Sequence, residues 1–144
     1  MGTQEKLIKI CRQYSIRLLY LFGSQAEKGL QIINGSAVEL NDPLTDLDLG
    51  VVFRNGLPSA AKLPNLYSAL YNLLTDLFLP LPLDLVFLQE QHSVFRAEAV
   101  TGICIYTDDP LYKEYYEEDV MRKAADFKPF LEMFYKERFE EISK

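Results

Sequence analysis

The sequence has few of the residues on which several common kinds of site depend. Among 144 residues there are two cysteines, one histidine and no tryptophan. Cys11 and Cys104 are far apart and show neither metal-ligand nor disulfide spacing, so we interpret both as reduced thiols of the core. The single histidine, His92, supports neither a zinc cluster nor a serine–histidine triad, and we expect it at the surface. Zinc-centred and disulfide-stabilised classes are therefore excluded.

Long apolar runs and an excess of positive charge are also missing. No run approaches the roughly 20 residues that span a bilayer, and the start of the chain lacks the hydrophobic region of a signal peptide. Fifteen Lys and Arg stand against 21 Asp and Glu, which leaves a net charge of -6. This balance argues against general nucleic-acid binding, because such binding needs clustered cations on phosphates. We expect a cytoplasmic protein without a membrane segment.

What is present suits one globular unit. About half of the residues are apolar and a quarter are charged, as in ordinary globular proteins. A chain of this length buries one core, so we predict a single domain over residues 1–144. Whether it forms a homo-oligomer is left open.

Hydrophobic spacing in the first half of the chain predicts two strands with a helix on either side of the pair. Residues 17–22 and 47–53 are short apolar runs typical of buried strands. The polar stretch 25–43 between them is interpreted as a loop. The first helix is expected to end near Ser15, and its apolar residues are Leu7, Ile10, Cys11 and Tyr14. A core-facing helix follows Pro58 and Pro64 and is closed by Pro80, and its apolar positions are Leu66, Leu70, Leu73, Leu74 and Leu77.

In the second half, residues 83–88 predict a third strand, residues 94–100 a helix, and residues 103–106 a short last strand. From about residue 110 the chain is expected to form a helical C-terminal tail, broken or bent at Pro129. Two helices or one bent helix satisfy this pattern. Strands alternating with helices indicate an α/β (α+β) fold with a mixed sheet of about four strands flanked by helices.

Three motifs carry candidate chemistry, and the first is Gly23-Ser24 at the end of a strand. Glycine lets the backbone turn sharply beside a ligand, and the free N–H groups of a following helical turn favour an anion. The Ser24 hydroxyl adds one donor for a phosphate oxygen. Alone, such a pair is most often just a turn.

The other two motifs are acidic. Asp46 and Asp48 stand two residues apart, so they project from the same face of a strand, where their repulsion calls for a cation or a proton. Asp84 lies among apolar residues, where an unpaired charge is costly. If the strand of Asp84 lies beside that of Asp46 and Asp48, three carboxylates converge, and oxygen ligands suit Mg²⁺ or Mn²⁺. The alternatives are a solvent-facing acidic edge and an Asp paired with a nearby Arg.

In combination these motifs resemble the minimal nucleotidyltransferases of the DNA polymerase β superfamily. The resemblance rests on FGSQAEKG (residues 22–29), TDLDLGVVF (residues 45–53) and LDLVFL (residues 83–88), and extends loosely to YKERFEEI in the tail. It implies a nucleotidyltransferase fold, with Gly23 and Ser24 on the nucleotide phosphates and Asp46, Asp48 and Asp84 on two Mg²⁺ ions. The 21 residues between Ser24 and Asp46 exceed the usual spacing of the family.

The resemblance also implies an activity and a partner. Stand-alone members act as antitoxins that add AMP from ATP to a helical HEPN toxin. One alternative is a small-molecule nucleotidyltransferase of the aminoglycoside-modifying type, for which this chain is short. A third is a non-catalytic antitoxin that neutralises its partner by binding.

Other residues are less specific. Phe127, Phe130, Leu131 and Phe134 form a helical stripe that could meet a partner. We interpret it instead as a cover for the chain's own core. Arg96 and Glu98 could line the nucleotide site or belong to an exposed helical face.

Overall fold

The computed structural model describes residues 2–40 and 45–143. In this part of the chain the elements are, in order, α1 (Thr3–Gln13), β1 (Ile16–Phe22), α2 (Ala26–Ile33), β2 (Leu47–Phe53), α3 (Leu63–Phe78), β3 (Leu83–Phe87), the 3-10 helix η1 (Leu88–Glu90), α4 (Ser93–Val100), β4 (Ile103–Thr107) and α5 (Pro110–Ser143). The predicted α+β class, the mixed four-stranded sheet and the C-terminal helix are confirmed.

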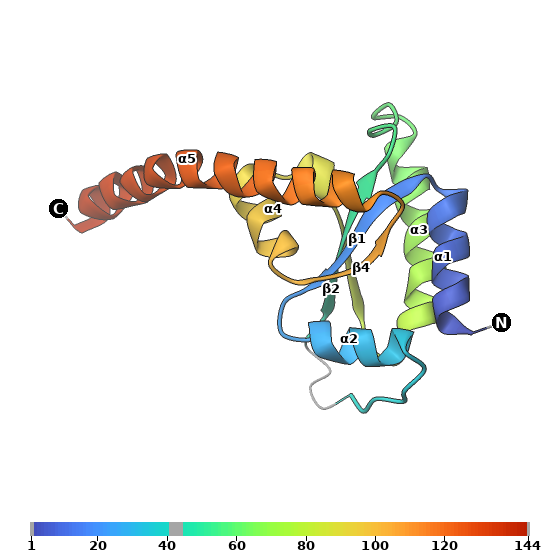
Figure 1. The fold of residues 1–144 in the computed structure, drawn as a ribbon. Helices are drawn as coiled ribbons and strands as arrows, with labels where there is room; N and C mark the ends of the chain where they lie inside the picture. Colours follow the sequence, from blue (N-terminus) through green and yellow to red (C-terminus); the bar gives the residue numbers. More distant parts are fainter. Residues whose placement is uncertain (1, 41–44, 144) are drawn as a thin grey trace.

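The sheet has the strand order β3-β2-β1-β4. β1 runs antiparallel to both of its neighbours, whereas β2 and β3 are parallel. The parallel pair needs a crossover, and α3 supplies it. α1, α2 and α3 cover one face of the sheet, and α4 with the first half of α5 covers the other (Figure 1).

β1 and β2 are buried on both faces because helices pack on each side of the sheet. Six of the seven residues in each strand are buried, which is why the sequence shows continuous apolar runs there instead of alternation. The larger core lies under α1, α2 and α3, with Leu70, Leu74 and Phe78 as its contribution from α3. The smaller core joins β1 to α4 and α5 through Ala99, Tyr116 and Val120.

The prediction of a loop from 25 to 43 was wrong in its first part. Residues 26–33 form α2, residues 34–40 are irregular, and positions 41–44 lie outside the described residues. The segment has helical spacing at Ala26, Leu30 and Ile33. Gly29 lies within it, and because glycine disfavours helices the sequence predicted a loop. Gly29 is there because α2 packs tightly on β2: a Cβ at this position would lie 2.9 Å from Leu47 Cδ1.

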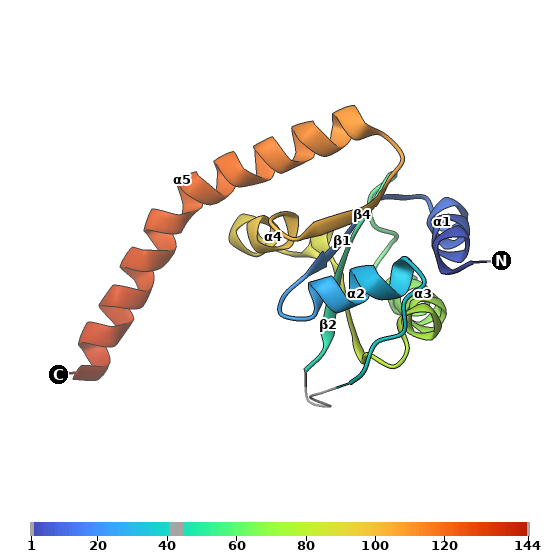
Figure 2. The ribbon, with the colours of Figure 1, turned by 60° about the horizontal axis from the view of Figure 1, so that its bottom comes forward.

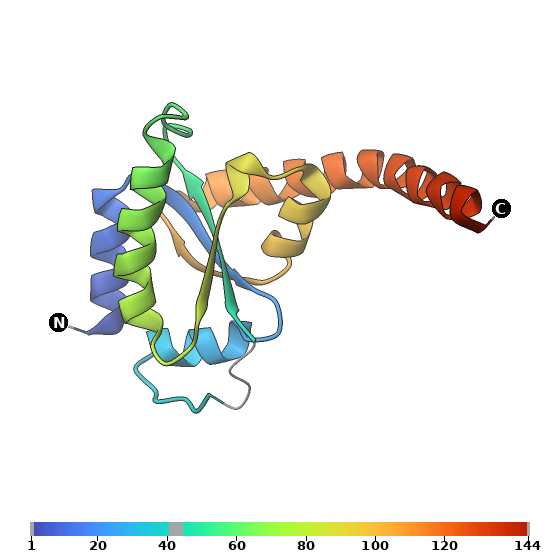
Figure 3. The same ribbon diagram turned by 180° about the vertical axis from the view of Figure 1, so that it is seen from behind.

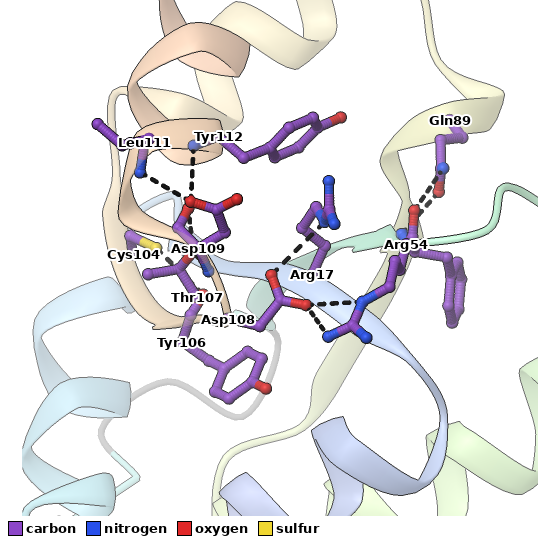
Figure 4. A network of polar contacts seen from close by, with 11 residues as sticks. Arg17, Arg54, Gln89, Cys104, Tyr106, Thr107, Asp108, Asp109, Leu111 and Tyr112 are labelled. Carbon is purple, nitrogen blue, oxygen red and sulfur yellow. Dashed lines mark hydrogen bonds and ion pairs between the residues drawn. The ribbon is translucent and has the colours of Figure 1, made fainter.

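The end of the sheet opposite the Gly23 turn is held by a polar network (Figure 4). Arg54 Nε donates to Asp108 Oδ2 at 2.8 Å, and Arg17 Nε lies 3.5 Å from Asp108 Oδ1. Arg17 also lies over the ring of Tyr112, 4.3 Å from its centre. Asp109 Oδ1 then accepts the N–H groups of residues 111 and 112, which caps the start of α5. The network therefore ties β1, β2 and β4 to the first turn of α5.

α5 is one continuous, bent helix, which decides between the two forms that Pro129 allowed. Its first half is anchored to the sheet, where Tyr20 Oη donates to Glu117 Oε1 at 2.8 Å. Its second half, residues 126–143, which we call distal α5, runs away from the rest of the molecule (Figures 1 and 2). The interpretation that the stripe covers the chain's own core is therefore wrong: Phe127, Phe130 and Phe134 are 41%, 68% and 48% exposed.

Candidate active site

The register of the sheet brings the predicted motifs together. Phe22, the last residue of β1, pairs with Asp48 of β2, and Asp48 pairs with Asp84 of β3. These three positions therefore form one row across three adjacent strands. We call its two aspartates, together with Asp46 just before β2, the acidic row. Gly23 follows Phe22 directly, so the Gly-Ser turn lies at the same end of the sheet as the carboxylates. The strands of Asp48 and Asp84 therefore lie side by side, as the predicted convergence of the carboxylates requires.

The backbone of Gly23 lies against the carboxylate of Asp48. Its φ is +77°, a conformation that residues with a Cβ adopt at a cost. A Cβ built on Gly23 would lie 2.2 Å from Asp48 Oδ2, a distance that no pair of heavy atoms tolerates without a bond. Glycine is therefore required here twice, for the turn and for the approach of the Asp48 carboxylate.

The turn after Gly23 leads into α2. Ser24 is exposed, and its Oγ accepts a long hydrogen bond from Gln25 Nε2 at 3.5 Å. Gln25 is the N-cap residue, and among the described residues no side chain caps the helix. Free N–H groups at a helix N-terminus favour an anion. The Ser24 hydroxyl and the start of α2 thus offer donors beside the acidic row.

The electrostatics of the row are unfavourable without a cation or a proton. The pKa of Asp48 is raised to about 6, first by burial and then by the charge of Asp84 and a hydrogen bond shared with it. The charges of Asp46 and Glu98 add to the effect. A carboxyl whose pKa is raised by burial and by neighbouring carboxylates is suited to exchange its proton for a metal ion.

The donor set fits a hard divalent cation, although the three predicted ligands are not gathered around one point. Asp46 precedes β2 and is exposed, Asp48 is half-buried, and Asp84 is exposed. Within residues 2–40 and 45–143, no three His, Cys, Asp or Glu side chains converge closely enough to hold a metal ion. Carboxylate oxygens are the ligands of Mg²⁺ and Mn²⁺. The chemistry of the residues therefore suits the ion, although binding would require the three side chains to come closer together than they are.

Two residues near the row come from helices. Glu98 of α4 is exposed and close enough for its charge to act on Asp48. Tyr67 of α3, which the sequence analysis did not single out, has its pKa raised by burial and then by the charge of Asp84, and its Oη donates to the Leu85 carbonyl at 2.9 Å. Only the pairing of β3 with its neighbours places either residue here, so no sequence signal could have found Tyr67.

Arg96 and His92 have structural roles instead. Arg96 donates to the main-chain oxygens of Gln91 and Gln89 at 2.7 and 3.2 Å, which holds η1 against α4. His92 is exposed, as expected, and its Nδ1 accepts the N–H of Phe95 at 3.3 Å, which caps α4. Arg96 is thus half-buried and engaged with the backbone, not part of an exposed helical face.

A mixed sheet with a Gly-Ser turn beside a row of aspartates defines a nucleotidyltransferase-like architecture. Residues 5–111 match the family model described as Polymerase beta, Nucleotidyltransferase. The chain therefore belongs to the polymerase β nucleotidyltransferase family, as the motifs indicated. No curated protein sequence matches it significantly.

Solved structures share the fold at low sequence identity. A chain of a mutant toxin–antitoxin complex, MntA-HpeT, is 18% identical with a TM-score of 0.62, over 98% of both chains. A toxin–antitoxin structure with AMP-PNP is 19% identical with a TM-score of 0.61, again over 98% of both. A complex of tri-AMPylated *Shewanella oneidensis* HEPN toxin with MNT antitoxin is 17% identical with a TM-score of 0.57, over 99% of this chain and 97% of that one. These neighbours are antitoxins solved with HEPN toxins.

Among the described residues, no helix is both long enough and apolar enough to cross a membrane.

Proposed function

We propose that this protein is a Mg²⁺-dependent protein adenylyltransferase that moves AMP from ATP to a hydroxyl group of a HEPN-type toxin, and so acts as its antitoxin in the cytoplasm. The observation that carries the proposal is the register Phe22–Asp48–Asp84, which sets the Gly23 backbone against the Asp48 carboxylate. This register supports the proposal because the donors of the Gly23 turn then lie beside the acids that we propose as metal ligands.

Each residue has a distinct role in the proposed reaction. The Gly23 turn, the Ser24 hydroxyl and the start of α2 hold the triphosphate oxygens. Asp46 and Asp48 hold the ions that carry the triphosphate, and Asp84 completes the ligand set on the acceptor side. Two bound Mg²⁺ ions, or Mn²⁺ in their place, would lower the pKa of the acceptor hydroxyl and stabilise the leaving pyrophosphate.

The transfer balances without a further reactant. The acceptor oxygen forms a bond to the α-phosphorus of ATP, the bond between the α-phosphorus and its bridging oxygen breaks, and pyrophosphate leaves. The proton of the hydroxyl passes to Asp84 or to water beside it. Position and charge do most of the work, as is typical of transfers to phosphorus.

The partner is proposed from the structural neighbours. They come from toxin–antitoxin complexes, one with AMP-PNP and one with a tri-AMPylated HEPN toxin and its MNT antitoxin, and they match this chain over 98–99% of its length. The raised pKa of Asp48 favours catalysis over binding alone, because a contact-only antitoxin needs no clustered acids. A small-molecule acceptor would need a pocket beside the acidic row; two cavities of the described part of the chain lie near Tyr14 and Leu57 and between α4 and α5.

A double substitution of the acids tests the proposal. Asp46→Asn with Asp48→Asn should abolish Mg²⁺-dependent transfer, because both ions lose ligands, and we expect a loss of at least about 1,000-fold. The measurement is the mass of the neighbouring gene's product after incubation with this protein, ATP and Mg²⁺, where we expect wild type to add AMP in steps. Asp76→Asn, an exposed acid on α3, is the control. Undiminished transfer by the double variant would place the site elsewhere, and a stable unmodified complex with wild type would favour the contact-only antitoxin.

A further inference from the structure

Distal α5 carries an apolar surface that the rest of the chain does not use. Phe127, Phe130, Leu131 and Phe134, which we call the apolar stripe, follow the spacing i, i+3, i+4 and i+7, so they lie on one side of the helix. Phe130 is 68% exposed, and Met133 and Tyr135 beside the stripe are 59% and 64% exposed. Exposed large apolar side chains grouped in this way mark a contact surface in a soluble protein.

The stripe continues the face by which α5 already packs. Tyr116, Val120 and Ala124 recur every four residues and are buried against the sheet and α4. Phe127 and Leu131 lie seven residues beyond Val120 and Ala124, and Phe134 lies 18 beyond Tyr116, so all three are on the same side of α5; Leu131 is half-buried. Phe127 makes the last contact, 6.2 Å between its ring centre and that of His92 on α4. Beyond Phe127 the same side of the helix continues, but the sheet and α4 do not extend far enough to cover it.

A groove joins this face to the candidate active site. It has a volume of about 550 Å³ and lies between α4 and α5, with Val94, Ala97 and Glu98 on one wall and Met121, Ala124 and Lys128 on the other. Glu98 is also the α4 residue whose charge acts on Asp48. The groove therefore lies between the stripe, which begins beside Lys128, and Glu98, the α4 residue that faces the acidic row. Figures 1 and 3 show distal α5 and the β1–α2 turn on the side of the molecule away from α1 and α3, with distal α5 level with the top of the sheet and the turn below α4.

The charges around the stripe favour an apolar contact over an ionic one. Between residues 126 and 138 three acids, Asp126, Glu132 and Glu137, are balanced by three bases, Lys128, Lys136 and Arg138. Arg138 lies over the Phe134 ring at 4.9 Å, so part of the basic charge is held along the helix itself. Glu140 and Glu141 beyond the stripe leave distal α5 with a net charge of -2, so the even balance is confined to the turns that carry the stripe. Anchors at i, i+3, i+4 and i+7 on an amphipathic helix are the pattern by which a helix enters an apolar groove of a partner.

We propose that the apolar stripe and the α4–α5 groove form the docking surface for the acceptor protein, a helical partner that offers an apolar groove between two of its helices. This inference rests on the proposed function for the identity of the partner. The groove ends at Glu98, on the same helix that packs beside β1, and this position is the reason to assign the surface to the acceptor and not to a second copy of this chain, because the acceptor hydroxyl has to reach the acidic row.

The test replaces two anchors by charges and keeps the catalytic residues intact. Phe130→Glu with Phe134→Glu lowers the net charge by two, and so does the control Lys136→Glu, at an exposed residue of the same helix. The measurements are the Kd for the purified product of the neighbouring gene, AMP transfer to it at saturating ATP, and the thermal shift of this protein with ATP and Mg²⁺. The thermal shift should be the same for all three proteins, since the site and the fold are unchanged.

We expect the double variant to bind the partner at least about 30-fold more weakly, as for the loss of central aromatic anchors, and the control to stay within about twofold of wild type. Equal binding by wild type and the double variant overturns the docking surface. So does sedimentation that shows a wild-type dimer dissociated by the double substitution while partner binding is unchanged, because the stripe would then belong to a second copy. A wild-type chain that does not bind the partner overturns it as well.

The chemistry and the docking surface fail in different ways. If wild type binds but adds no AMP, and the double variant binds weakly, the docking surface stands and the proposed transfer falls. If wild type adds AMP and the double variant does so equally well, the transfer stands and the docking surface falls.

Discussion

Gly23 is the residue on which the geometry of the candidate site depends most. Its backbone lies where any side chain would collide with Asp48, so the phosphate turn and the acidic row can approach each other only through glycine. The Gly-Ser motif therefore does more than permit a turn. It sets how closely the bound phosphates can approach the metal-binding acids.

Gly23→Ala should therefore damage binding more than folding. The added Cβ displaces the Asp48 carboxylate, and we expect the affinity for ATP with Mg²⁺ to fall at least about tenfold with a stability loss of about 1–3 kcal/mol. Titration calorimetry and urea unfolding measure the two effects. Gly35→Ala is the matched control, since Gly35 also has a positive φ, +90°, but open space around its Cβ; it should cost about 1 kcal/mol and leave ATP binding intact. Equal affinities for the two variants would show that the contact with Asp48 has no part in the site.

Asp48 makes the site dependent on pH even without a ligand. Its pKa is raised to about 6, above the value of an unfolded aspartate near 3.9. The folded state therefore holds this proton more tightly, so the carboxyl favours folding below about pH 4 and loses that contribution as the pH rises through 6. At neutral pH the ionised Asp48, facing Asp84, Asp46 and Glu98, destabilises the fold.

Asp48→Asn should then stabilise the metal-free protein at pH 7.5 by about 1 kcal/mol, a value discounted for the partial exposure of the carboxyl. The gain should shrink towards zero near pH 4. Denaturant unfolding at several pH values without Mg²⁺ measures it, with Asp76→Asn as a control that shows no such trend. Added Mg²⁺ should raise the melting temperature of wild type and not that of Asp48→Asn. A gain that does not depend on pH would contradict the repulsion among these acids.

At the scale of elements, α2 shows why the long spacing between Ser24 and Asp46 is compatible with the family architecture. The extra residues are not only a loop: α2 packs on the sheet through Ile32 and Ile33, and Lys28 Nζ donates to the Glu39 carbonyl at 3.3 Å across the following segment. The turn and the acids stay adjacent because β1 and β2 are paired along their length, whatever the chain does between them. Strand pairing, not spacing in the sequence, holds the site together.

α5 shows how one helix serves two purposes. Up to Ala124 it completes the smaller core, and beyond it the same face is exposed. Proline inside a helix removes a hydrogen bond and bends it without ending it where enough turns lie on each side. Pro129 lies inside distal α5, within the apolar stripe, so a bend there would affect the direction in which the stripe faces.

At the scale of the whole molecule, the sheet with its helices should be stable without distal α5. In the segment 126–144 the side chains at 126–130, 132–138 and 140 are exposed, so we expect its deletion to change the free energy of unfolding by less than about 1 kcal/mol. Deleting from Asp119 also removes Val120 and Ala124, which are buried, and should cost at least about 2 kcal/mol.

Thermal and denaturant unfolding of the two truncated chains measure this difference. The shorter deletion should also retain the thermal shift with ATP and Mg²⁺, since Gly23, Asp48 and Asp84 lie far from distal α5 in the sequence and on the sheet. A large loss of stability on deleting 126–144 would show that distal α5 packs back on the molecule in solution.

Local patterns in the sequence determined a large part of this protein. The strands at 17–22, 47–53 and 83–88 and the helix closed by Pro80 follow from apolar runs bounded by breakers, because burying those side chains leaves few other options. The family could be inferred from three short motifs in order. Gly-Ser and Asp-x-Asp are typical of phosphate and cation binding, and packing alone does not require either of them.

Tertiary structure decided what depends on residues far apart in the sequence. The pairing of Asp48 with Asp84, the contact of Gly23 with Asp48 and the position of Glu98 arise from strand order and helix placement, which no local spacing encodes. The stripe from Phe127 to Phe134 has the same period whether it covers a core or extends into solvent. Which of the two occurs depends on where the sheet and α4 end. An amphipathic pattern identifies the apolar side of a helix but does not identify what covers that side.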